Sequence, residues 1–272
     1  ADTLRKAKTE TVANLIAEGV PTRLWAHDPS LWVTDKTVQD EVRKRLGWLD
    51  LPQSSRAGLK EILTFVAQVR ADGFTHVLLL GMGGSSLAPE VLSMVFPSLL
   101  PGGVTFSILD STDPAQVLAA DRAFPPDKTL YVISSKSGGT AEINAMFDYF
   151  WERSGQDGSH FVAITDPGTI LDALANEHGF RKTFHADPTV GGRYSALTHF
   201  GLVPAALMGI DPERLLNRAE GMMRQCAADV TGTRNPGLVL GAILGQAAVD
   251  GRDKLTFLAD ESVAPVGTWR EQ

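Results

Sequence analysis

Short apolar runs alternate with helix-length patterns through most of the chain. The runs at 77–80 and 130–133 have the length and apolar character of buried strands, and the second is rich in β-branched residues. Further strands are expected at 104–109 and 161–165, with a short fifth at 182–185, and the run at 130–133 belongs to a strand at 129–134. The alternation predicts an α/β fold, in which five parallel strands form one doubly wound sheet flanked by helices.

The residues before the first strand carry apolar positions at helical spacing, so they are predicted to form a helical segment. Three helices are expected there, from about Leu4 to Gly19, from Thr34 or Asp35 to Leu46, and from Ser54 or Ser55 to Val69. Ser, Thr and Asp favour the capping position because their side-chain oxygens accept a backbone N–H. We expect the tryptophans of this segment to pack against a core; they are Trp25, Trp32 and Trp48.

Further helical patterns separate and follow the strands, at about 87–96, 169–178, 198–208, 212–229 and 236–250. Lys254–Leu258 then has the pattern of a new strand. These patterns divide the chain into three parts. They are a helical segment at 1–72, a sheet domain with its following helices at 73–250, and the start of an incomplete second domain at 251–272.

The third strand ends in a run of hydroxyl residues and glycines, Ser134-Ser135-Lys136-Ser137-Gly138-Gly139-Thr140, and a helical pattern begins soon after it. The first N–H groups of a helix lack partners within the helix, and the helix dipole favours negative charge there. The hydroxyls and the ammonium add side-chain donors. The run is therefore a candidate anion site, although Ser, Gly and Thr also occur in ordinary helix-capping turns.

Two further glycine-rich turns accompany this run. Gly81-Met82-Gly83-Gly84-Ser85-Ser86 follows the first strand, and Gly191-Gly192-Arg193-Tyr194-Ser195 follows the fifth. In a doubly wound sheet, ligands bind beyond the carboxyl ends of the strands, where the strand order reverses. The turns after the first and third strands both lie at such ends, so they could face one pocket.

Composition narrows the functions that such a pocket could serve. The net charge of −7 argues against a general nucleic-acid binder, which needs Lys and Arg to neutralise phosphates. The single cysteine, Cys226, excludes an intrachain disulfide and fits a reducing compartment. The sequence has neither a membrane-length apolar stretch nor the apolar region of a signal peptide at its first residues. A cytoplasmic protein without a membrane partner is predicted.

Three chemistries compete for the glycine turns. The first turn nearly matches the Gly-x-Gly-x-x-Gly dinucleotide fingerprint, and Asp110 ends the next strand. However, Ser86 replaces the third glycine, and hydroxyls stand where a dinucleotide turn keeps a bare backbone. Nucleophilic catalysis is not supported, because the sequence contains no Gly-x-Ser-x-Gly motif. His185 and His199 are more often structural polar residues than catalytic bases. No metal site is expected, because the six histidines are scattered and no second cysteine is present.

The third possibility is the binding of a phosphorylated small molecule, without a cofactor. This function accounts for the residues of all three turns. Two hydroxyl-rich turns would wrap one phosphate. Lys136 would add one positive charge. Arg193 would add a second, suited to negative charge that develops on a sugar.

The three turns resemble the N-terminal signature blocks of glucose-6-phosphate isomerase, in the same order and with similar spacing. The matching blocks are Gly81-Met82-Gly83-Gly84-Ser85-Ser86-Leu87-Ala88-Pro89, Ser135-Lys136-Ser137-Gly138-Gly139-Thr140-Ala141-Glu142 and Gly191-Gly192-Arg193-Tyr194-Ser195. The Trp-x-x-Asp-x-x-Leu-Trp run at 25–32 is most similar to the isomerase half of bacterial bifunctional transaldolase/glucose-6-phosphate isomerases. The resemblance implies two sugar-isomerase (SIS) domains, the first at 73–250 and the opening of the second at 251–272.

The resemblance also implies an activity, the interconversion of glucose 6-phosphate and fructose 6-phosphate through a cis-enediol intermediate. Carried over by position, the phosphate-binding residues would be Gly84, Ser85, Ser135, Lys136, Ser137 and Thr140. Arg193 would be catalytic, because it would stabilise the negative charge of the intermediate. Ile143 stands where some relatives use a threonine. Glu142 matches a family glutamate, and a structural role at the helix start is an equal alternative.

The family's catalytic base lies in a Glu-Ser-x-Gly-Lys block, which does not occur in this sequence. Its ring-opening histidine and C-terminal lysine would also lie beyond Gln272. We therefore expect a half-site that binds sugar phosphate and turns it over negligibly. The alternative is a non-catalytic sugar-phosphate-binding SIS module, while other SIS isomerases are disfavoured by the Gly-Gly-Arg-Tyr-Ser block. The family usually dimerises, so a homodimer is a possible assembly.

Overall fold

The computed structural model describes residues 5, 7–96 and 104–269. The chain forms two compact units. The sheet unit comprises Ser54–Leu215 and Ala259–Gln272, and the helical unit comprises Ala1–Gln53 and Leu216–Leu258. The predicted helical segment at 1–72 is thus shared, because its last helix, α6 (Leu59–Ala71), lies in the sheet unit.

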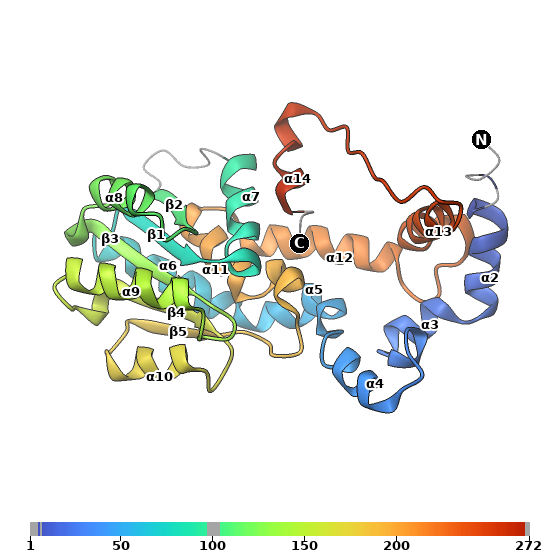
Figure 1. The fold of residues 1–272 in the computed structure, drawn as a ribbon, viewed down its shortest axis with the longest axis horizontal. Helices are drawn as coiled ribbons and strands as arrows, with labels where there is room; N and C mark the ends of the chain where they lie inside the picture. The colour runs from blue at the N-terminus through green and yellow to red at the C-terminus, as the bar shows by residue number, and fades with distance from the viewer. Residues whose placement is uncertain (1–4, 6, 97–103, 270–272) are drawn as a thin grey trace. The chain divides into compact units, whose positions relative to one another are not determined.

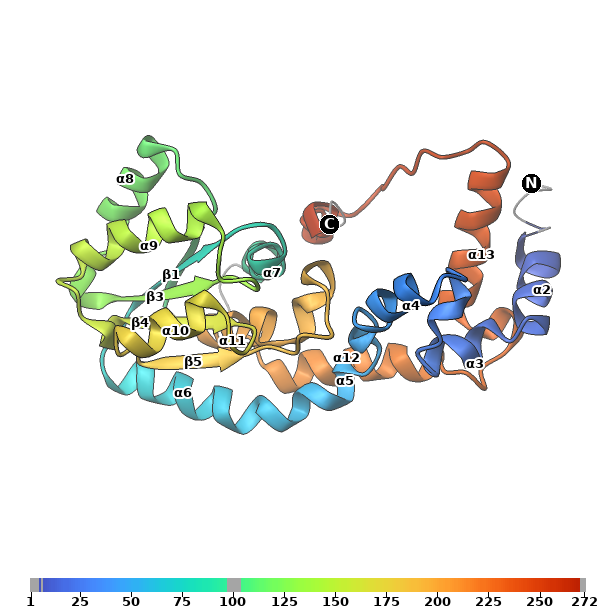
Figure 2. The same ribbon diagram turned by 60° about the horizontal axis from the view of Figure 1, so that its bottom comes forward.

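Five parallel strands form the sheet, in the order β2-β1-β3-β4-β5 (Figures 1 and 2). Their bounds are β1 His76–Gly81, β2 Thr105–Leu109, β3 Thr129–Ser134, β4 Phe161–Thr165 and β5 Lys182–His185. The predicted strands and the doubly wound parallel sheet are confirmed. The order reverses between β1 and β3, which are neighbours although β2 lies between them in the sequence.

The three central strands, β1, β3 and β4, are buried along almost their whole length because helices cover both faces of the sheet, whereas the edge strands β2 and β5 are partly exposed. Val77–Leu80 and Leu130–Ile133 are fully buried, as is typical of parallel strands between two helical layers. One face carries α8 (Pro114–Ala123), α9 (Ala141–Arg153) and α10 (Ile170–Glu177) (Figure 2). The other carries α6, α7 (Leu87–Val95) and α11 (His199–Met208).

Aromatic rings fill the core between the sheet and α9. The ring of Tyr131 lies 5.2 Å from that of Phe150 and 5.1 Å from that of Phe161, measured between centroids. All three side chains are fully buried. Burial raises the pKa of Tyr131 to about 12, so its phenol is neutral at physiological pH.

Two helices of the sheet unit begin at the predicted threonines. The Thr169 hydroxyl accepts the backbone N–H of Asp172 and caps α10. The Thr198 hydroxyl accepts the N–H of Phe200 and caps α11. Each cap satisfies an N–H that the first helical turn leaves without a partner.

The helical unit consists of helices and short helical turns. Its α-helices are α2 (Val12–Ala17), α3 (Val20–Trp25), α4 (Lys36–Arg43), most of α5 (Leu51–Ser54), the end of α12 (Pro212–Gln225) and α13 (Pro236–Val249), and it also contains a π-helical turn at Ala7–Thr11 and 3-10 turns at Pro29–Leu31, Gly47–Leu49 and Gly232–Arg234. The Trp25 indole donates a hydrogen bond of 2.8 Å to the carbonyl of Cys226. This contact agrees with the predicted packing role of Trp25, but the same expectation is wrong for Trp32, which is 52% exposed.

The predicted starts and ends of these helices are confirmed in part. Gly19, in the left-handed region at φ +69°, separates α2 from α3. The Asp35 carboxylate caps α4, as expected, but the helix ends at Arg43 rather than Leu46. Leu4 lies outside the described residues.

The predicted cap at Ser54 or Ser55 is wrong. Ser54 ends α5, and α6 begins only at Leu59. The Ser55 hydroxyl donates to the carbonyl of Leu197, 2.6 Å away and remote in sequence. The Ser55 hydroxyl therefore bonds to an acceptor distant in sequence, instead of capping a helix locally as we expected.

The predicted strand at Lys254–Leu258 is also wrong, since 252–260 has neither helix nor strand. A strand forms only where a neighbour accepts and donates its backbone hydrogen bonds, and this segment pairs with no described strand. Leu258 is 96% exposed.

None of the helices in the described part of the chain has the length and apolar character needed to cross a membrane.

Replacing Phe150 by alanine should lower the free energy of unfolding of the sheet unit by about 3–5 kcal/mol, because a fully buried ring would leave a cavity. Chemical denaturation would measure this loss. Leu118→Ala is the control, since Leu118 on α8 is 44% exposed and should change stability by about 0.5 kcal/mol or less. Equal losses in the two variants would contradict the packing described here.

Candidate functional site

The site begins where β1 and β3 end side by side. Gly81 pairs with Ser134 at the carboxyl ends of these strands, so the turns that follow them are neighbours. The Ser134 hydroxyl then donates a hydrogen bond of 2.7 Å to the carbonyl of Ser85. This bond joins the first turn, 81–86, to the second, 134–140, at the reversal of strand order where doubly wound sheets bind ligands.

The third turn, 191–195, packs against the first. The Ser195 hydroxyl lies within hydrogen-bond distance of two carbonyl oxygens, 3.0 Å from Gly84 and 2.7 Å from Gly192. A Cβ atom on Gly84 would lie 2.6 Å from the Gly192 oxygen, closer than any side chain tolerates. Glycine at position 84 therefore allows the two backbones to touch.

Hydroxyl groups line the second turn. The buried Ser135 hydroxyl accepts the N–H of Gly138 at 3.2 Å and lies 3.5 Å from that of Thr140. The Ser137 hydroxyl accepts the N–H of Gly139 at 3.4 Å. Thr140 precedes α9, yet its side chain makes no capping hydrogen bond. The N-terminus of α9 therefore keeps donors that can bind an anion.

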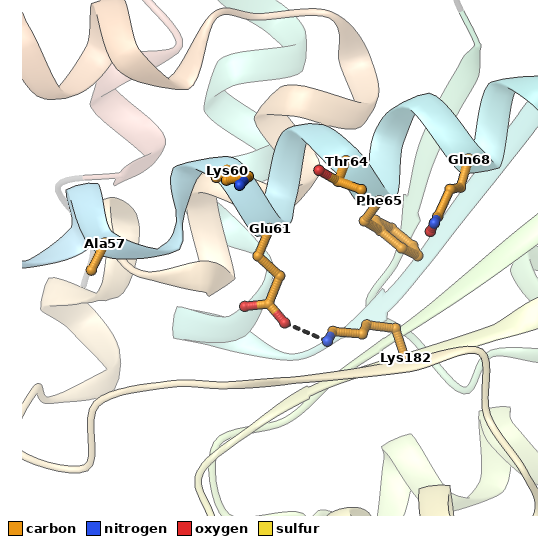
Figure 3. A pocket seen from close by; sticks show the side chains of 7 residues that line it. All are labelled: Ala57, Lys60, Glu61, Thr64, Phe65, Gln68 and Lys182. Atoms are coloured by element: carbon orange, nitrogen blue, oxygen red, sulfur yellow. Dashed lines mark ion pairs between the residues drawn. The ribbon is translucent and has the colours of Figure 1, made fainter.

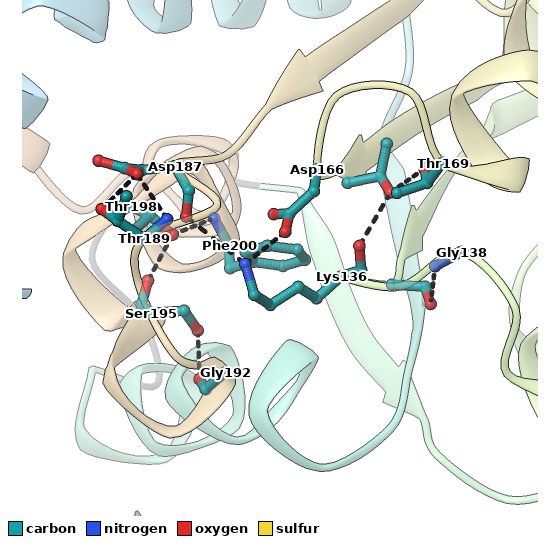
Figure 4. Close-up of polar contacts among 12 residues, drawn as sticks. Lys136, Gly138, Asp166, Thr169, Asp187, Thr189, Gly192, Ser195, Thr198 and Phe200 are labelled. Atoms are coloured by element: carbon teal, nitrogen blue, oxygen red, sulfur yellow. Dashed lines mark hydrogen bonds and ion pairs between the residues drawn. The ribbon is translucent and has the colours of Figure 1, made fainter. Parts of the chain in front are cut away.

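Lys136 does not stand alone in this turn. Its ammonium lies 2.5 Å from a carboxylate oxygen of Asp166 and 3.5 Å from the carbonyl of Asp187 (Figure 4). The two charged side chains are mostly buried, with 20% of Lys136 and 16% of Asp166 exposed. The positive charge of Lys136 is therefore balanced by the neighbouring carboxylate of Asp166.

Arg193 has the opposite environment. Its side chain is exposed on the third turn, and within the described ranges its guanidinium makes no hydrogen bond or ion pair. Glu142 is also exposed, in the first turn of α9. An acidic residue there interacts favourably with the helix dipole, which fits the structural alternative.

Comparison with known proteins gives the family of this chain. A family model described as phosphoglucose isomerase matches residues 57–255, a range that includes all three turns. The chain belongs to the phosphoglucose isomerase family. The predicted resemblance is thus confirmed, while the closer similarity to bifunctional proteins stays a prediction.

Two curated relatives illustrate the match. A glucose-6-phosphate isomerase from Thermus thermophilus is 36% identical over 208 residues, which are 73% of this chain and 48% of that protein. One from Carboxydothermus hydrogenoformans is 34% identical over 195 residues, 66% of this chain and 42% of that protein. The chain therefore spans less than half the length of these relatives.

Solved structures agree with the fold. The crystal structure of a hypothetical protein from Thermus thermophilus matches with a TM-score of 0.79 and 28% identity, over 98% of this chain and 61% of that one. A glucose-6-phosphate isomerase from Chlamydia trachomatis matches with a TM-score of 0.64 and 22% identity, over 85% of this chain and 42% of that one. At that identity the second match shows likeness of fold alone.

The structure brings one further residue, Asp166, to the phosphoglucose isomerase turns. The sequence analysis assigned no role to it. In the sequence, Asp166 is simply the residue that follows the fourth strand. Because β4 is the neighbour of β3, Asp166 meets Lys136 at the same edge of the sheet. An aspartate directly after a buried strand is the signal that could have found it.

The turn after β4 supports the second turn. The Thr165 hydroxyl lies 2.7 Å from that of Thr169 and 3.5 Å from the Lys136 carbonyl. Gly138 has φ +69°, and a Cβ atom there would lie 2.6 Å from the backbone nitrogen of Leu171. Only glycine combines this backbone conformation with such close contact.

The two histidines that we expected to be structural make structural contacts. The His185 ring lies 2.9 Å from an Asp172 carboxylate oxygen, and this hydrogen bond lowers the pKa of Asp172. The His199 ring lies 2.6 Å from the His185 carbonyl. Burial lowers the pKa of His199. No cluster of metal-ligating side chains occurs among the described residues.

A separate hollow of about 480 Å³ lies over α6 and β5 (Figure 3). Its lining residues are Ala57, Lys60, Glu61, Thr64, Phe65, Gln68 and Lys182. None of them belongs to the three turns. The ion pair between Glu61 and Lys182 reaches across it, so this hollow offers an anion less free positive charge than its two lysines suggest.

Gly84→Ala should lower the free energy of unfolding by about 1–3 kcal/mol, because the new methyl group would force the first and third turns apart. Thermal unfolding would measure the loss. Gly192→Ala is a matched control on the other side of the same contact, since a Cβ there would meet nothing within 4 Å. Similar stability of the two variants would contradict the close approach.

The lowered pKa of His199 should make the protein less stable in mild acid. The folded state binds the proton more weakly than the unfolded state, whose histidine keeps its usual pKa of about 6.5. Stability should therefore be steady above that pH and fall as the pH drops below it. Denaturation at pH 7 and pH 5.5 would show a smaller fall in His199→Gln. An unchanged fall in this variant would exclude His199 as its source.

Proposed function

We propose that this chain forms the phosphate-binding half-site of a glucose-6-phosphate isomerase, which interconverts glucose 6-phosphate and fructose 6-phosphate. One observation carries the proposal. The three turns that carry the family blocks, far apart in sequence, are joined by the hydrogen bonds from Ser134 to Ser85 and from Ser195 to Gly84. They meet at the carboxyl ends of β1 and β3, where this class of sheet binds its ligands.

Hydrogen-bond donors, more than net charge, would hold the phosphate. The proposed ligands are the backbone at Gly84 and the side chains of Ser85, Ser135, Lys136, Ser137 and Thr140. The open N-terminus of α9 adds backbone N–H groups and the positive end of its dipole. Since Lys136 is paired with Asp166, it would act as an oriented donor rather than as an unbalanced charge.

Arg193 would supply the charge that the reaction itself requires. Moving a proton between C1 and C2 of the sugar places negative charge on the oxygens of an enediol intermediate. An exposed guanidinium without a partner among the described residues can meet that charge with several N–H donors. Arg193 would therefore be the catalytic residue of this chain.

The proton transfer also needs a base, and the sequence contains no Glu-Ser-x-Gly-Lys block. We therefore expect residues 1–272 to bind sugar phosphate but to turn it over negligibly by themselves. We further propose that 73–250 is the first SIS domain and 251–272 the start of a second. We also propose that the protein is cytoplasmic, has no nucleic-acid partner and forms a homodimer.

Calorimetric titration with 6-phosphogluconate, an open-chain sugar phosphate, tests the function. We expect saturable binding with a Kd nearer ~1 mM than ~1 µM, because a half-site offers few contacts. Ser135→Ala should abolish it, because it removes a proposed donor to the phosphate. Arg193→Ala should also abolish it, because the carboxylate of 6-phosphogluconate places negative charge at the end of the sugar that Arg193 is proposed to meet.

Two control substitutions lie at the opposite edge of the sheet. Arg122→Ala removes an exposed arginine from the last turn of α8, and Ser154→Ala removes a hydroxyl that bonds within its own helix end. Both variants should bind like the unmodified chain. Binding of NAD, titrated alongside, would favour the dinucleotide alternative. Absence of 6-phosphogluconate binding would refute the half-site.

A further inference from the structure

Two neighbouring strands supply the acceptors that surround the Lys136 ammonium. Asp166, directly after β4, provides a carboxylate oxygen at 2.5 Å, and Asp187, after β5, provides a backbone carbonyl at 3.5 Å (Figure 4). Because β4 is the neighbour of β3 and β5 the neighbour of β4, both acceptors lie at the carboxyl edge that carries the phosphate turns.

The backbones of Lys136 and Asp166 are themselves bonded. The Asp166 N–H donates to the Lys136 carbonyl at 3.3 Å, and the Ser135 N–H donates to that of Ile164 at 3.0 Å. These bonds continue the pairing of β3 with β4 beyond the last residues of the strands. The lysine and the aspartate therefore start from backbones whose separation the sheet fixes.

Burial makes this pair more than a surface contact. Exposed fractions of 20% for Lys136 and 16% for Asp166 mean that both groups have lost most of their water. The second carboxylate oxygen of Asp166 is buried and accepts no hydrogen bond from the described residues. A carboxylate in such a place is costly without a cation beside it, so its position is tied to the lysine.

We propose that Asp166 is a positioning residue, which holds the Lys136 ammonium so that its remaining N–H points into the phosphate cradle. An ammonium has three donors, and the structure assigns one to Asp166 and one to the Asp187 carbonyl. The third is free for a ligand oxygen. This inference rests on the proposed function, since it concerns the same phosphate site.

Asp166→Asn would have two opposing effects on that site. It would remove a negative charge near the anionic ligand, which should strengthen binding, and it would release the ammonium from its fixed place, which should weaken it. Asparagine has nearly the size of aspartate, so packing is preserved. If Asp166 positions Lys136, the second effect prevails.

The test is a double-mutant cycle, titrated with inorganic phosphate and with 6-phosphogluconate. We expect Asp166→Asn to weaken binding about fivefold or more, and Lys136→Met to weaken it further. The double variant should bind no more weakly than Lys136→Met, because Asp166 has no task once the ammonium is gone. Asp166→Glu, which keeps the charge but displaces it, should weaken binding about twofold and serves if the asparagine variant fails to fold.

A matched control comes from the opposite edge of the sheet. Asp121 pairs with Arg153 at 2.7 Å, and 14% of its side chain is exposed. Asp121→Asn thus breaks an ion pair whose carboxylate is about as buried as that of Asp166, although 48% of its partner Arg153 is exposed. It lies near the ends of α8 and α9 and should leave phosphate affinity unchanged.

Each outcome separates the inference from the function beneath it. If the unmodified chain binds neither ligand, the proposed function fails and this inference fails with it. If it binds and Asp166→Asn binds equally well or more tightly, only the positioning role is overturned. Additive effects in the cycle would also overturn it, because Asp166 would then act independently of Lys136.

Discussion

The backbone pairing of β1 with β3 is the constraint on which the site depends. These strands are neighbours although β2 lies between them in sequence, so two glycine-rich turns emerge side by side at one edge of the sheet. Parallel pairing needs a crossover for each connection, and the right-handed crossovers put helices on both faces. The buried apolar strands and the covering helices follow from the same arrangement, as does the open N-terminus of α9 beside the first turn.

Close backbone approach is the second condition of the site. Gly84 lies against the third turn, and Gly138 lies against the start of α10. Side chains at either place would fill the space that one turn leaves for the next. The hydroxyls of Ser134 and Ser195 then bond to carbonyls of the first turn. Small residues therefore do two things here, since they let the turns touch and supply short donors that hold them.

The distribution of charge suggests how an acidic protein can bind an anionic ligand. The chain carries a net charge of −7, so its overall field repels a phosphate. The charge of Lys136 is balanced by Asp166, and Arg193 remains without a partner among the described residues. Under the proposed function, binding relies on oriented donors and a helix terminus, while the unbalanced guanidinium serves the charge that develops during the reaction.

The sequence alone determined the local structure: the places of five strands, the helix starts at Thr169 and Thr198, and the residue types of the three turns. It assigned the Ser55 hydroxyl to a helix cap and Lys254–Leu258 to a strand, because neither pattern reveals a distant acceptor or the lack of a neighbouring strand. Only the tertiary structure decided that β4 lies beside β3, and hence that Asp166 meets Lys136. Strand order depends on which strands pair across long loops, and local periodicity carries no record of that choice.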